Sequence, residues 1–272
     1  MDWLDFREPV SAWTHCAWML LSLPAMLLLW TRSGGSPAKR LGLMVFGLSL
    51  AACYGASTLF HAVRLPPEQV EVFATLDALA IYLLIAGSVT PVALVVLRGW
   101  WRWCTLVGAW LVAAAGVALD LAPVDVPPAL STGLYLGMGW GVALCYFPLA
   151  RTVSHRALWP LVVGGVSYSV GAVLNRLGWP TLVPGVLGAH ELFHLFVMGG
   201  SLAHFWFMLT VVAPFERVAL VPCDQASGDG RLSGASIEPG QEGGHPFPPQ
   251  WLHHGTPEIA QGRRRPDETE RQ

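Results

Sequence analysis

Long apolar runs, each about as long as a membrane-spanning helix, follow one another along most of the chain. Seven such runs are separated by short segments rich in Pro, Gly and charged residues, and a transmembrane helix needs about 20 mostly apolar residues. The pattern therefore predicts an all-α integral membrane protein, a seven-transmembrane helix bundle. The expected spans are residues 13–31, 40–62, 72–97, 101–119, 129–150, 158–177 and 187–213.

We expect the first run to be a membrane span and not a cleaved signal peptide. A signal peptide begins with net positive charge. The segment before this run carries Asp2, Asp5 and Glu8 against Arg7 alone. We therefore count the run as the first of the seven spans.

Charged residues are scarce and unevenly placed. Of the 272 residues, 53% are hydrophobic and 12% are charged, whereas an ordinary soluble domain has about 25% charged residues. This composition excludes a disordered chain, a coiled coil and a nucleic-acid binder, and it is unfavourable for a soluble enzyme. Residues 218–272 hold 13 of the 34 charged residues and lack apolar periodicity. We predict a transmembrane domain over residues 1–217 and a polar, disordered cytoplasmic tail over residues 218–272.

The basic residues predict an orientation. Seven spans place the two ends of the bundle on opposite sides, and the side with more Arg and Lys near the spans faces the cytoplasm. Three basic residues lie on the N-terminal side and eight on the other: Arg7, Arg64 and Arg176 against Arg32, Lys39, Arg40, Arg98, Arg102, Arg151, Arg156 and Arg217. We expect the N-terminus outside and the C-terminus in the cytoplasm.

The basic residues also suggest a source. Fifteen of the sixteen are Arg, a bias typical of GC-rich bacterial genomes. We expect a protein of a bacterial inner (plasma) membrane, with membrane lipids as its partners.

A few ionisable residues lie inside the predicted spans, where they are costly and indicate function. Ser57 and His61 are four residues apart near the end of the second span, and His190 and His194 are four apart at the start of the seventh. Residues at this spacing share one helix face. Asp77 lies near the start of the third span. Because the second span runs opposite to the third and seventh, all five residues are expected at one membrane face.

Three His and a carboxylate in an apolar bundle suit a zinc site. A catalytic zinc ion has three protein ligands and a water molecule, whose pKa it lowers to about 7. We assign His61, His190 and His194 as ligands, with Asp77 and Ser57 holding the water and Asp77 accepting its proton. The alternative is that each His simply forms a hydrogen bond with a neighbouring helix.

Residues 190–194 also match the HExxH motif of zinc metalloproteases, in which the Glu is the general base. An intramembrane metalloprotease is therefore a competing hypothesis, with Asp77 or His61 as its third ligand. Glu191 lies about 100° around the helix from His190, so it would face a neighbouring helix or the lipid headgroups instead.

Two further His residues fall in the spans. His204 follows His194 by ten residues, about 15 Å along a helix, so it cannot share the same metal ion and is expected to form an interhelical hydrogen bond. His15 starts the first span on the side of the site. It is either a neighbour of the site or an interfacial residue.

Four segments of the chain carry motifs: Glu8-Pro-Val-Ser-Ala-Trp-Thr-His15, Ser57-Thr-Leu-Phe-His61, residues 77–91 and residues 190–204. In this order they resemble the hemolysin III family, the bacterial branch of the progestin and adipoQ receptors (PAQR), which is related more distantly to alkaline ceramidases. The first segment resembles the family's opening Glu…Asn-x-x-Thr-His. Ser57-Thr-Leu-Phe-His61 is similar to its Ser-Thr-Leu-Tyr-His, and residues 77–91 are similar to its Asp-His-x-x-Ile-Tyr-Leu-Leu-Ile-Ala-Gly-x-x-Thr-Pro. Residues 190–204 resemble its closing motif. The resemblance covers about residues 8–212.

The resemblance implies a seven-helix fold with zinc held by His61, His190 and His194, and with Asp77 and Ser57 around its water. It also implies a candidate activity, the hydrolysis of a lipid amide. One position departs from the family, since Ala78 stands where the family has a His after the Asp.

Three functions are compatible with the sequence. The first is a zinc-dependent hydrolase of a lipid amide or ester. The second is a receptor-like sensor with a structural zinc ion. The third is a lytic membrane protein, for which no span has the amphipathic pattern of a pore lining.

Overall fold

The computed structural model describes residues 6–216, and the predicted tail lies outside this range. Within it the elements are helices, with one isolated bridge between Val183 and Leu187. Seven helical segments are long and apolar enough to cross a membrane, which confirms the predicted fold. The helices are α1 (Pro9–Arg32), α2 (Pro37–Ala62), α3 (Pro67–Pro91), α4 (Gly99–Asp120), α5 (Pro128–Gly141), α6 (Tyr146–Ala150), α7 (His155–Leu177) and α8 (Ala189–Phe207). Three short helices continue α3, α5 and α8: η1 (Val92–Val96), η2 (Val142–Cys145) and η3 (Met208–Val212).

Several helices begin earlier than the sequence predicted, by up to five residues for α3. The reason is that α1, α2, α3 and α5 each begin with a Pro, at positions 9, 37, 67 and 128. All four prolines lie outside the spans that the apolar pattern predicts. Pro is favourable in the first turn of a helix, where its missing N–H would have no intrahelical partner and its fixed φ is already helical.

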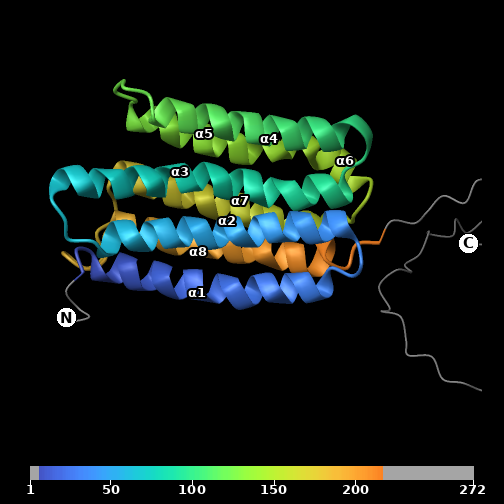
Figure 1. The fold of residues 1–272 in the computed structure, drawn as a ribbon, viewed down its shortest axis with the longest axis horizontal. Helices are drawn as coiled ribbons and strands as arrows, with labels where there is room; N and C mark the ends of the chain where they lie inside the picture. Colours follow the sequence, from blue (N-terminus) through green and yellow to red (C-terminus); the bar gives the residue numbers. More distant parts are fainter. Residues whose placement is uncertain (1–5, 217–272) are drawn as a thin grey trace, which may run out of the picture. The chain divides into compact units, whose positions relative to one another are not determined.

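The helices divide into a closely packed group and a looser pair. Helix α2 packs between α1 and α3, and α8 packs against α7 and also contacts α1. Helix α4 packs mainly on α3, while α5 touches α3, α4 and α7 less extensively, so α4 and α5 form the outer layer in Figure 1. This arrangement brings the end of α2 and the starts of α3 and α8 to the same end of the bundle.

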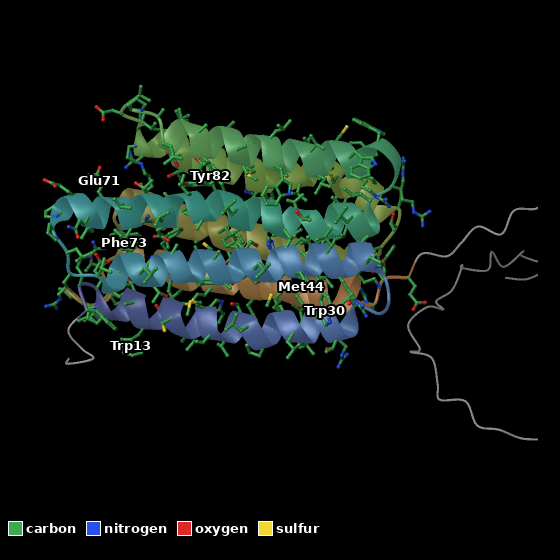
Figure 2. All side chains as sticks on the ribbon, in the orientation of Figure 1. Trp13, Trp30, Met44, Glu71, Phe73 and Tyr82 are labelled. Atoms are coloured by element: carbon green, nitrogen blue, oxygen red, sulfur yellow. The ribbon has the colours of Figure 1, made fainter. Side chains whose placement is uncertain are left out.

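Large apolar side chains cover the outside of the bundle. Trp13 and Trp30 on α1 are more than one-third exposed, as are Trp100 and Trp103 on α4, and many Leu and Val side chains elsewhere are similarly exposed. Figure 2 shows such side chains projecting from the helices along their length. So continuous an apolar surface would cause aggregation in water, whereas it is stable in contact with lipid chains. The chain is an integral membrane protein.

One glycine allows α2 to approach α3 closely. A Cβ atom at Gly42 would lie 2.8 Å from the Cα of Pro91. This backbone atom cannot move away as a flexible side chain could. We expect Gly42→Ala to reduce the free energy of unfolding by about 1–3 kcal/mol, the usual cost of overpacking. The measurement is the melting temperature of the purified protein in detergent.

Gly133 on α5 provides the matched control, because a Cβ atom there would meet no heavy atom within 4 Å. Gly133→Ala is expected to leave the melting temperature unchanged or to raise it slightly, since Ala is the better helix former. Equal melting temperatures for the two variants would contradict the close contact between α2 and α3.

Candidate metal site

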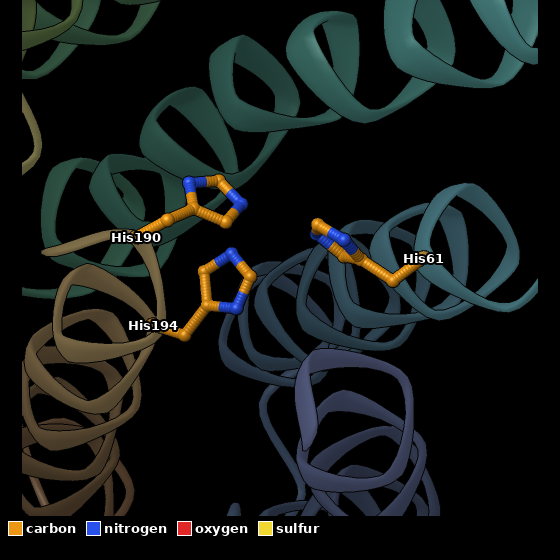
Figure 3. Close-up of side chains that lie close together, drawn as sticks. All are labelled: His61, His190 and His194. Atoms are coloured by element: carbon orange, nitrogen blue, oxygen red, sulfur yellow. The ribbon is translucent and has the colours of Figure 1, made fainter. Parts of the chain in front are cut away.

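Three His side chains from two helices meet near one end of the bundle. His61 lies on the last turn of α2, and His190 and His194 lie on the first turns of α8. One ligand nitrogen from each ring lies within 4.8 Å of the other two. Figure 3 shows the three rings around a shared space, with His61 facing the pair on α8. The structure thus brings together the three residues that the sequence analysis assigned as metal ligands.

His61 is held in place by Glu8, which directly precedes α1. The Nδ1 atom of His61 lies 2.6 Å from a carboxylate oxygen of Glu8, and the backbone N–H of Glu8 donates to the carbonyl of His61 at 3.0 Å. The other carboxylate oxygen of Glu8 lies 3.3 Å from Nε of Arg7. A carboxylate beside Nδ1 keeps the proton on that nitrogen, so Nε2 of His61 carries the free lone pair. This Nε2 atom is buried and has no hydrogen-bond partner.

The two His residues on α8 also expose nitrogen atoms to the cluster. Nδ1 of His190 lies 3.3 Å from the amide oxygen of Asn175 on α7, which favours the proton on Nδ1 and the lone pair on Nε2. Nδ1 of His194 is buried without a partner. The centre of the His61 ring lies 5.2 Å from that of His190 and 4.8 Å from that of His194.

These features fit a bound metal ion better than a set of isolated hydrogen bonds. Buried polar atoms in native proteins nearly always have a partner, yet His61 and His194 each leave a buried nitrogen without one. Three nitrogens around one zinc ion, with bonds of about 2.1 Å, lie roughly 3.4 Å apart, so small ring rotations suffice to bring this cluster to that size. Imidazole suits zinc, and a carboxylate or carbonyl on the second ring nitrogen is the usual support of a metal-bound His.

Asp77 and Ser57 lie beside the cluster and not within it. Ser57 is one turn before His61 on α2 and is buried, and its hydroxyl lies next to the Asp77 carboxylate on α3. Among the described residues, the group that could share one metal ion consists of the three His alone. Both Asp77 and Ser57 line a cavity of about 940 Å³ that also borders His190 and His194.

The cavity runs far beyond the His cluster. Its walls come mainly from α2, α3, α5, α6, α7 and α8, and they extend from the site to Phe147 and Leu158, near the opposite end of the bundle. Most of the lining is apolar, including Ile81, Leu161 and Val197. The cavity therefore has room for a long hydrocarbon chain with one end at Asp77.

His15 borders the site directly, which settles the alternative that the sequence left open. Its ring centre lies 4.1 Å from that of His194, and both of its nitrogens are buried without a hydrogen-bond partner. His15 also lines the cavity. The rotation of α1 about its own axis, which the sequence alone does not determine, places this side chain inward.

The carboxylate of Glu191 is not directed toward the His cluster, although the metalloprotease hypothesis requires this of a general base. Its carboxylate accepts a hydrogen bond of 2.8 Å from the backbone N–H of Gly188 and so caps the start of α8. A carboxylate in this role stabilises the helix N-terminus. The geometry therefore does not support Glu191 as the general base of a metalloprotease.

Two residues that support the His ligands, Glu8 and Asn175, were not among the predicted site residues. Glu8 opens the first motif and was counted only as a charge before the first span. A carboxylate directly before an apolar helix that starts on the side of the site was the available signal. Asn175 had a weaker signal, since it is a single amide near the end of a span.

The fold and this cluster define a class: a seven-helix integral membrane protein with a buried histidine cluster at one membrane face. The chain belongs to the Haemolysin-III related family, whose pattern matches residues 5–205. It is 34% identical to Hemolysin-3 of Bacillus cereus over 210 residues, covering 76% of this chain and 93% of that protein. It is 33% identical to the Hemolysin-3 homolog of Bacillus subtilis over 213 residues, covering 77% of this chain and 97% of that one. The human Monocyte to macrophage differentiation factor is 25% identical over 209 residues, covering 74% of this chain and 82% of that protein.

Proposed function

We propose that the protein is a zinc-dependent hydrolase of a lipid amide or ester, with His61, His190 and His194 holding the metal ion. The observation that carries this proposal is the shared position of two features. Three imidazoles that could share one metal ion, two of them with a buried nitrogen that has no partner, adjoin a carboxylate and a hydroxyl at one end of a large apolar cavity. Polar, ionisable groups at one end of a long apolar cavity suit a substrate that has a reactive carbonyl group and a long acyl chain.

The reaction adds water to the substrate carbonyl and breaks its bond to nitrogen or oxygen, releasing a fatty acid and an amine or alcohol. Zinc bound by three imidazoles supplies a Lewis acid and lowers the pKa of water to about 7. Asp77 takes the proton from the attacking water and returns it to the leaving nitrogen or oxygen. Ser57 donates to Asp77 and orients it, while the apolar walls hold the acyl chain and exclude bulk water.

The direct test measures fatty acid release by the purified protein in detergent, using paired long-chain amides and esters such as ceramides, N-acylethanolamines and monoacylglycerols. We expect release from at least one pair, loss of release with a zinc chelator and recovery on adding zinc. Binding of zinc without hydrolysis of any acyl lipid would contradict the hydrolase and leave the metal site standing.

A receptor-like sensor with a structural zinc ion is the second candidate, and one observation favours it. The cluster joins α2 to α8, and Glu8 ties it to the start of α1. A metal ion there would cross-link α2 and α8 and, through Glu8, would hold the start of α1, so that their packing could respond to a bound lipid. Under this hypothesis the removal of zinc lowers the melting temperature. Neither the wild type nor any variant hydrolyses an acyl lipid.

We expect Glu8→Ala to weaken zinc binding by about 10- to 100-fold, the usual effect of removing the partner of a metal-bound His. Without the carboxylate, Nδ1 of His61 no longer holds its proton in place and the ring is freer to rotate. Competition with a chelator of known affinity measures this change. Glu71→Ala is the control, because Glu71 is exposed on the first turns of α3 at the same end of the bundle (Figure 2). Equal zinc affinities for both variants would remove Glu8 from the site.

We also propose that the site lies toward the outer face of a bacterial plasma membrane. The support is the excess of Arg and Lys near the other end of the bundle. A periplasm-dependent reporter fused after residue 217 should be inactive, and a cytoplasm-dependent reporter at the same position should be active. The reverse result would invert the orientation.

A further inference from the structure

A second polar position lies deep in the cavity, away from the His cluster. Tyr168 on α7 and His204 on α8 both line the cavity, and their ring centres are 5.4 Å apart at a steep angle. His204 follows His194 by ten residues on the same helix, so it lies about 15 Å further along the axis. Apolar residues such as Leu161 and Val197 line the cavity near them.

Two glycines make room for these rings in a reciprocal arrangement. A Cβ atom at Gly164 on α7 would lie 2.3 Å from the His204 ring, and one at Gly200 on α8 would lie 2.9 Å from the Tyr168 ring. Each helix therefore provides a ring and, facing the other ring, a residue without a side chain. Larger residues at either position would push the rings out of their place beside the cavity.

The two side chains leave unused hydrogen-bonding capacity toward the cavity. The His204 ring lies beside the backbone carbonyl of Leu161 on α7, the position that the predicted interhelical hydrogen bond requires. A neutral imidazole that donates to this carbonyl keeps its other ring nitrogen as an acceptor. The Tyr168 hydroxyl has no hydrogen bond to another residue in the described part of the chain. A phenol and an imidazole in a mostly apolar wall are costly unless a guest pairs with them.

We propose that Tyr168 and His204 bind a hydroxyl group on the acyl chain of the substrate, far from the reacting carbonyl. This inference rests on the proposed function of the site as an acyl-lipid hydrolase. A carbon–carbon bond of about 1.5 Å advances an extended chain by roughly 1.25 Å, so 15 Å corresponds to about twelve carbons. The substrate class is an amide or ester of a long-chain fatty acid that carries a hydroxyl near carbon 12.

A hydroxyl is the group that these two side chains complement. It donates to the free nitrogen of His204 and accepts from the Tyr168 hydroxyl. A carboxylate only accepts, so it leaves the His204 nitrogen without a donor. A methylene group leaves both side chains unpaired.

The test is a binding measurement with three fatty acids of the same length: 12-hydroxyoctadecanoic, 2-hydroxyoctadecanoic and octadecanoic acid. Each displaces a fluorescent fatty acid from the purified protein, so that hydrolysis is not required. We expect 12-hydroxyoctadecanoic acid to bind roughly three- to tenfold more tightly than the other two, the effect of one net hydrogen bond. Equal affinities for the three acids in the wild type would overturn the proposal.

Tyr168→Phe removes the hydroxyl and keeps the ring, so the preference for the 12-hydroxy acid should disappear while octadecanoic acid binds as before. Tyr82→Phe is the matched control, because Tyr82 packs against Tyr135 and is not among the residues that line the cavity. His204→Phe is a second test and should also remove the preference. A preference that survives Tyr168→Phe and His204→Phe refutes the second site. Absence of hydrolysis with the preference intact refutes only the proposed function.

Discussion

Replacing both His190 and His194 by Ala is expected to remove the metal ion from the protein. Wild-type protein purified without chelators should hold about one zinc ion per chain, as a site of three His ligands implies. The double variant keeps only His61, and one imidazole cannot hold zinc against the buffer. Its zinc content should fall to less than about one-tenth of an ion per chain. Mass spectrometry of the dissolved protein gives both numbers.

His155→Ala is the control for the loss of an imidazole elsewhere. His155 begins α7, and its Nδ1 lies 2.7 Å from the Tyr146 hydroxyl, far along the chain from the cluster. This variant should keep the zinc content of the wild type. Full zinc retention in the double His variant, or a wild type without zinc, would refute the metal site. Lipid analysis of cells that produce the wild type or the double variant then shows which acyl lipid accumulates when the site is lost.

The seven spans and the meeting of the His residues were predictable because each depends on a single simple constraint. Span length follows from the thickness of the bilayer. The common depth of His61, His190 and His194 follows from counting odd and even spans, which fixes the end of the bundle at which each residue lies. The helix starts were less accurate, because Pro is compatible with both a loop and the first turn of a helix.

The supporting residues were not predictable in the same way, because they depend on how each helix is rotated about its axis. His15 lies on α1 and Glu8 directly precedes this helix, and both side chains point toward the cluster. A rotation of α1 by half a turn would have placed His15 in the headgroups with no change in the apolar pattern. Asn175 depends likewise on the packing of α7 against α8.

Glu191 is the converse case, because the sequence motif is present but the Glu side chain does not have the position that the motif implies. The string His190-Glu191-x-x-His194 is present, and its two His residues do meet in one cluster. The Glu lies next along the helix, about 100° around from His190, and so turns to the N-terminus of α8. Position on a helix face, and not adjacency in sequence, decides which carboxylate can reach the site.

That carboxylate is Asp77, and Asp77→Asn is the sharpest test of chemistry at the site. Asn has nearly the same size but cannot accept the proton of the attacking water, so we expect the hydrolysis rate to fall by about 10²- to 10⁴-fold, the usual contribution of a general base. Zinc content should stay at the wild-type value, because the cluster that could share one ion has no carboxylate among residues 6–216. Rate and zinc content are measured on the same preparation.

The control is Asp120→Asn, since Asp120 accepts hydrogen bonds from Ser131 and Tyr135 and does not line the cavity. It should reduce the rate little. If Asp77→Asn loses zinc together with activity, Asp77 acts as a ligand and its role as a proton acceptor fails. If it keeps both, the proton passes through another group, and His15, which lies beside His194 with both ring nitrogens unpaired, is a candidate. Loss of rate with zinc retained separates a catalytic metal ion from a structural one, because removal of a neighbouring carboxylate does not impair a purely structural cross-link.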